Sequence, residues 1–150
     1  MNFRTLILFV IAPLFLVACG SKDHGHDHSH GADGKEWKEM DSFHMVMAEA
    51  FHPYKDSANL VPAKQNASDL ATSAKEWRDS EIPDGVDAAK VKPKLDELVR
   101  LSDEFGKQVS SSTDDQIASS LTILHDLFHD LQNEFYAASA EHEHGDDHHH

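Results

Sequence analysis

Apolar residues recur at spacings of three and four along most of the chain, and no run shows convincing alternation of apolar and polar residues. This pattern predicts amphipathic helices and no strands. Four segments have the helical period, at about residues 35–51, 62–78, 87–110 and 113–140. The connections between them are short, so the sequence predicts an all-α, up-down-up-down four-helix bundle over residues 35–140.

Prolines and capping residues set the predicted helix ends. We expect the first helix to end near Phe51, because Pro53 disfavours helical geometry at the residue before it. Pro93 predicts a displaced or kinked start to the third helix. Thr113 and Gln116 have the spacing of a capping box, which predicts the start of the fourth helix.

One face of each segment supplies the predicted core. Its members are Trp37, Met40, Met47, Ala48 and Phe51 in the first segment, Ala63, Ala67, Leu70, Ala74 and Trp77 in the second, Val91, Leu95, Leu98, Leu101 or Ser102, Phe105 and Val109 in the third, and Ile117, Leu121, Leu124, Phe128, Leu131 and Phe135 in the fourth.

The two ends of the chain differ from the predicted bundle. Residues 1–18 have the layout of a secretory signal peptide, because Arg4 precedes an apolar run from Leu6 to Ala18 that is short for a membrane span. Residues 19–34 and 141–150 contain no large apolar residue and are rich in Asp and His. Such segments bury too little surface to offset the entropy of ordering, so we expect a disordered tether and a disordered tail.

The net charge of the chain limits the kinds of molecule that it can bind. The chain has 13 Lys and Arg against 27 Asp and Glu, a net charge of −14, and loss of residues 1–18 with Arg4 leaves 12 against 27, or −15. A strongly acidic surface repels nucleic acids and anionic headgroups and attracts cations. No nucleophile triad or phosphate-binding loop is evident, so we expect no enzyme activity and no nucleic-acid partner.

Three histidines of the predicted bundle suggest a metal site. His44 is predicted to lie in the middle of the apolar face of the first helix, while His125 and His129 lie one turn apart along one edge of the fourth. The first and last helices of such a bundle are antiparallel neighbours, which puts these three residues at one height. With Asp41 as the nearest carboxylate, the set has the ligands of a tetrahedral site, for zinc first and for copper, nickel or cobalt as alternatives. The opposing interpretation is that these are ordinary structural histidines, and His52 is interpreted as a cap or surface residue.

The predicted tails carry nine more histidines, and short His-rich tracts are typical of metal binding. They are His24, His26, His28 and His30 near the N-terminus and His142, His144, His148, His149 and His150 near the C-terminus.

Two resemblances add expectations. Residues 16–20, Leu-Val-Ala-Cys-Gly, resemble the bacterial lipobox, which implies a lipid-anchored protein of the cell envelope whose mature N-terminus is lipidated Cys19. If the host is Gram-negative, Gly20 after the cysteine implies the outer membrane, facing the periplasm.

The helical segments resemble the cytochrome b562 and cytochrome c′ type of four-helix bundle in size and layout. That resemblance implies haem b as an alternative cofactor, held by Met40 or Met47 with His125 or His129, although the Cys-x-x-Cys-His attachment motif of the c′ branch is absent. The His-rich sequence also suits a metal- or pH-responsive sensor or an interaction lipoprotein, whose partner would be a metal transporter or an envelope signalling protein.

Overall fold

The computed structural model describes residues 36–143, with side chains as far as residue 137. The helices are α1 (Lys38–Ser57), α2 (Val61–Gln65), α3 (Ala67–Asp79), α4 (Ala88–Gln108) and α5 (Asp114–Glu143), and the described residues contain no strand. None of these helices has the length and apolar character needed to cross a membrane. The prediction of an all-α helical bundle is confirmed, while the predicted signal peptide, the tether and most of the tail lie outside the described residues.

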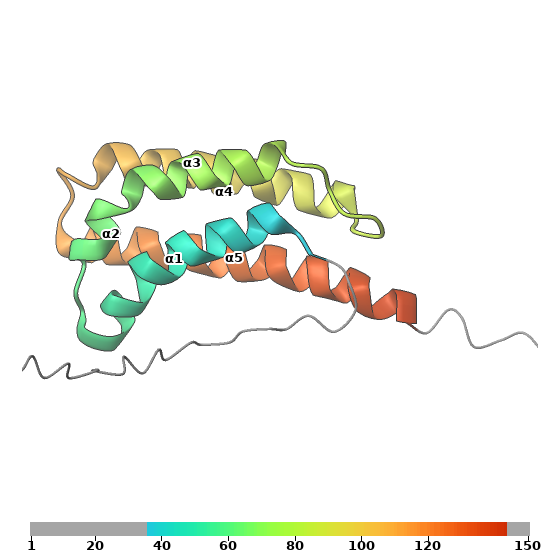
Figure 1. Cartoon of the computed structure of the whole chain (residues 1–150). Helices are drawn as coiled ribbons and strands as arrows, with labels where there is room; N and C mark the ends of the chain where they lie inside the picture. The colour runs from blue at the N-terminus through green and yellow to red at the C-terminus, as the bar shows by residue number, and fades with distance from the viewer. Residues whose placement is uncertain (1–35, 144–150) are drawn as a thin grey trace, which may run out of the picture. The chain divides into compact units, whose positions relative to one another are not determined.

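The four long helices pack in a closed ring, in which α1 contacts α3 and α5 while α4 contacts the same two helices (Figure 1). Along the seam between α1 and α5, Trp37 contacts Phe135, Phe43 contacts Phe128, and Phe51 contacts His125. Since the partner numbers fall as the α1 numbers rise, the two helices run antiparallel, as the sequence predicted.

The first helix does not end where Pro53 suggested, because α1 continues to Ser57. Proline has no N–H to donate to the carbonyl one turn earlier, which makes it unfavourable inside a helix. The extra turn is nevertheless stabilised, since Phe51 is buried and Tyr54 packs edge-on against it. The helix ends at Ala58, whose φ of 56° is left-handed and whose N–H donates to the Tyr54 carbonyl at 2.8 Å.

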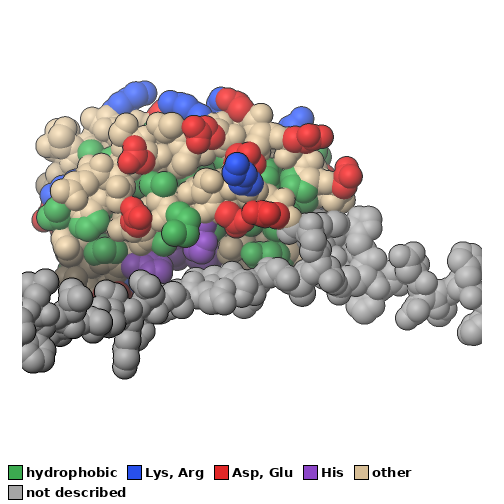
Figure 2. Space-filling model, viewed as in Figure 1, with side chains coloured by type: hydrophobic (Ala, Val, Ile, Leu, Met, Phe, Trp, Pro, Cys, Tyr) green, Lys and Arg blue, Asp and Glu red, His purple; other side chains and the backbone are tan. Residues whose placement is uncertain are grey.

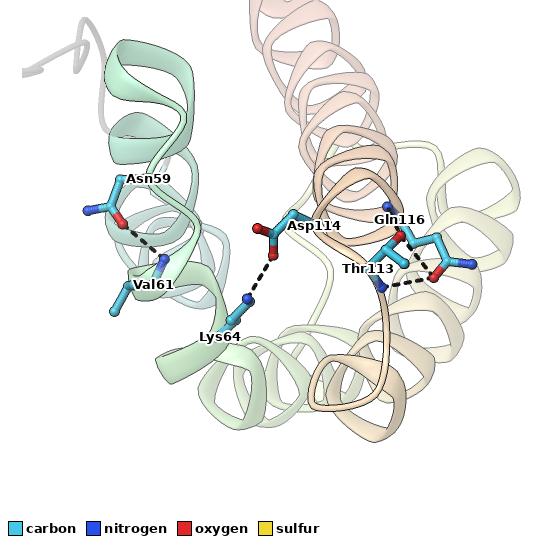
Figure 3. A network of polar contacts seen from close by, with 6 residues as sticks. All are labelled: Asn59, Val61, Lys64, Thr113, Asp114 and Gln116. Carbon is cyan, nitrogen blue, oxygen red and sulfur yellow. Dashed lines mark hydrogen bonds and ion pairs between the residues drawn. The ribbon is translucent and has the colours of Figure 1, made fainter.

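The predicted second helix is two helices, α2 and α3, separated at Asn66. The predicted inward residues of this segment are all buried, so the break changes the direction of the chain without changing its apolar face. At the start of α2 the Val61 N–H donates to the Asn59 side chain at 3.1 Å, and Lys64 forms a 2.8 Å ion pair with Asp114 of α5 (Figure 3).

The start of α5 agrees with the cap that the sequence predicted there. The Gln116 N–H donates to the Thr113 hydroxyl at 3.3 Å, and the Thr113 N–H donates to the Gln116 side chain at 3.0 Å (Figure 3). This reciprocal pair is the predicted capping box. Helix α4 keeps Pro93 inside it and begins at Ala88, where the Asp87 carboxylate accepts from the Ala89 N–H at 2.9 Å.

Candidate metal centre

His125 and His129 meet on the edge of α5 that faces α1. Their Nε2 atoms are 3.1 Å apart. Two nitrogens bound to one tetrahedral zinc ion, each 2.0–2.1 Å from it, are separated by about 3.3 Å. The structure therefore brings the two residues together, one turn apart, with close to the spacing that shared coordination needs.

The other ring nitrogen of each histidine faces an oxygen. His129 Nδ1 is 3.1 Å from Gln132 Oε1, and His125 Nδ1 is 3.6 Å from the Asp126 carboxylate. An acceptor at Nδ1 favours the tautomer with its proton there and leaves Nε2 with a lone pair, as in the outer shell of metal sites. The two Nε2 atoms are themselves within hydrogen-bonding distance, so a ring that carries its proton on Nε2 donates to the other, and a metal ion bound by both nitrogens would replace that proton.

Packing gives the two imidazoles different environments. The His125 ring is stacked on Phe51, with ring centroids 3.7 Å apart and planes inclined by 10°, and it is half-buried. His129 is exposed, and its ring contacts the core at Phe128. Burial lowers the pKa of His125, and the positive charges of His129 and His52 act in the same direction, while Asp126 opposes them. These effects favour the neutral imidazole, which is the form that binds a metal.

His44 does not lie in the centre of the apolar face of α1, as the sequence suggested. Phe43 occupies that centre, fully buried against Trp77 and Phe128, while His44 is half-buried and stacks on Phe128 with a centroid distance of 5.0 Å. The reason is that α1 packs against both α3 and α5, so its buried face is wider and turned toward α3. Ala48, also predicted to be central, is likewise only half-buried.

Asp41 lies near His44. Partial burial raises the pKa of the Asp41 carboxyl, with Glu36 adding to the effect and the charge of His44 opposing it. Across the part of the chain that the structure describes, no three His, Cys, Asp or Glu side chains converge closely enough to hold one ion. The structure thus assembles the His125–His129 pair, and ligation by His44 and Asp41 together with it stays a prediction.

The haem alternative needs one methionine of α1 to face one of these histidines. Met40 and Met47 are each 1% exposed, packed in the hydrophobic core, while the two Nε2 atoms point at one another along the outer edge of α5. The donor set in this packing does not fit an axial methionine and histidine.

His52 was interpreted from the sequence as a surface or capping residue, and it is exposed on α1. Its charge also reaches His125 across the seam. Figure 2 shows histidine side chains along one edge of the visible face of the helical domain. Cys19 and the predicted N-terminal ligands lie outside the described residues, as do His144 to His150, and the side chain of His142 is also not described.

Comparison of the chain with protein-family models, with curated proteins and with solved structures gave no match. Function is therefore inferred from side-chain chemistry and geometry.

Proposed function

We propose that this chain is a lipid-anchored protein of the bacterial cell envelope that binds divalent transition-metal ions, zinc first and copper, nickel or cobalt as alternatives. The observation that supports this most directly is the His125–His129 pair, with Nε2 atoms 3.1 Å apart and each Nδ1 beside an oxygen. One helical turn separates the two residues, and contacts with Phe51 and Gln132 orient their rings. Such preorganisation reduces the entropic cost of binding.

The sequence outside the described residues adds the rest of the proposal. The nine tail histidines would supply weaker sites that collect ions, and lipidated Cys19 would hold the protein at the membrane, at the outer membrane in a Gram-negative host. The acidic balance of the chain favours cations near its surface. Buffering, delivery or resistance are the roles consistent with this combination, and a metal transporter is the kind of partner that delivery would need.

A sensor function is the second candidate, and one observation favours it. Protons and metal ions compete for the ring of His125, which is packed against the core residue Phe51. Burial and neighbouring positive charge lower its pKa, which favours the metal over the proton near neutral pH. Occupancy would then change the packing of the seam between α1 and α5, which an envelope signalling partner could detect.

The test is zinc titration of the full-length chain with all nine tail histidines replaced by asparagine and Cys19 by serine, which leaves the histidines of the described residues as the source of binding. We expect one site, which the double variant His125→Ala/His129→Ala loses. Asn133→Ala is the matched control, because it shortens another exposed polar side chain of α5 and should bind as before. Equal zinc binding by the double variant and the control would refute the proposed pair.

A further inference from the structure

The histidine pair on α5 faces two histidines of α1, His44 and His52, which are eight residues apart and flank Ala48. Only one of them is placed to share an ion with the pair. The ring contacts along the seam fix the register, since His44 contacts Phe128 and Phe51 contacts His125. By that register Ala48 lies at the height between the two α5 imidazoles.

The direction of helical side chains separates the two candidates. Cα–Cβ bonds in an α-helix tilt toward its N-terminus, so a side chain covers the turn that precedes its own Cα. The imidazole of His52 therefore leans back toward the height of Ala48 and the pair. The imidazole of His44 leans in the same direction along α1, which takes it away from the pair and toward the turn that contains Asp41.

The electrostatic contacts agree with these directions. The charge of His44 acts on Asp41, and the charge of His52 acts on His125. His44 is also half-buried and stacked on Phe128, while His52 is exposed and can change rotamer without disturbing the core.

We infer that His52 is the third ligand of the ion held by His125 and His129, and that His44 is not a ligand. This inference rests on the proposed metal-binding function and completes it. Among the described side chains no three ligands converge, so the inference requires His52 to change rotamer in order to reach the ion. Three imidazoles on an exposed edge leave the fourth position to water, an arrangement that suits a zinc or copper(II) ion that is exchanged with a partner.

The experiment compares three single variants of the chain with substituted tails, using zinc and a competing chelator of known affinity. His52→Ala should weaken zinc binding by about tenfold or more, since even the outer-shell partners of metal ligands contribute tenfold. His44→Ala is the matched control, because His44 is a histidine of the same helix two turns earlier. The zinc affinity of this variant should stay within about twofold of that of the parent chain. His129→Ala should abolish the site. Circular dichroism verifies that each variant folds.

A second measurement follows the imidazole protons by NMR during addition of zinc. We expect the signals of His52, His125 and His129 to shift together, with His44 unchanged. If His52→Ala binds zinc like the control while His129→Ala does not, the third-ligand inference is overturned and the proposed function stands. If neither His52→Ala nor His129→Ala changes the affinity, the proposed pair fails and the inference with it.

Discussion

Removal of His129 should separate the stability of the fold from the stability added by an ion. His129 is exposed, and its polar contacts are to Gln132 and His125, so in the absence of metal His129→Ala should change the free energy of unfolding by no more than about 0.5 kcal/mol. At a hundredfold excess of zinc over the dissociation constant, the ion should stabilise the unsubstituted protein by about 2.7 kcal/mol. For a domain of this size that corresponds to a rise in melting temperature of about 10–20 °C. The His129 variant should show little of it.

Two other variants make the result interpretable. His125→Ala should also lose the zinc-dependent rise but should cost about 1 kcal/mol without metal, because its half-buried ring is stacked on Phe51. His44→Ala should show a similar cost from its stacking on Phe128 and should keep the rise. The assay is thermal unfolding followed by circular dichroism, with chelator and with zinc, in the chain with substituted tails. A full zinc-dependent rise in both His125→Ala and His129→Ala would make these residues ordinary boundary residues.

Three further predictions concern pH, capping and anchoring. Because the pKa of His125 is lowered in the folded protein, the stability that this residue contributes is present above pH 6.5 and is lost as pH falls through the folded-state pKa. The free energy of unfolding in urea should therefore change less between pH 7.5 and pH 5.5 in His125→Phe than in the unsubstituted protein. Thr113→Ala removes one side of the capping box and should cost about 1 kcal/mol in urea unfolding, while Ser110→Ala, at an exposed serine in the preceding turn, serves as the control. Cys19→Ser should move the protein from the membrane to the soluble envelope fraction, and an unchanged distribution would contradict the lipid anchor.

The sequence predicted α5 best, because its local apolar period matches the packing of the helix in the bundle. The apolar stripe of α5 was predicted completely, because its six inward residues follow the helical period without interruption and all are buried. Its start was predicted because a capping box depends on residues three positions apart. The location of His125 and His129 on the edge of that stripe followed from the same geometry.

The first helix shows where periodicity is insufficient. It gives the direction of an apolar face but not the number of neighbours that the face meets, and α1 packs against two long helices, so Phe43 and Ala50 are buried and His44 is displaced to the edge. Pro53 ended the predicted helix too early, since the packing of Tyr54 against Phe51 and the left-handed cap at Ala58 do not follow from a local rule. That early end also put His52 at a helix terminus in the prediction.

The aromatic core gives this protein its own optical probe. Trp37 and Trp77 are its only tryptophans, and they touch one another edge to face. Phe128 bridges Trp77 to the histidine pair, with centroid distances of 6.1 Å to Trp77 and 5.1 Å to His129, so Trp77 and His129 are at most about 11 Å apart. A copper(II) ion on the pair would quench indole emission at that range, whereas zinc, with its filled d shell, would leave the emission unquenched. Fluorescence can therefore distinguish bound copper(II) from bound zinc without any label.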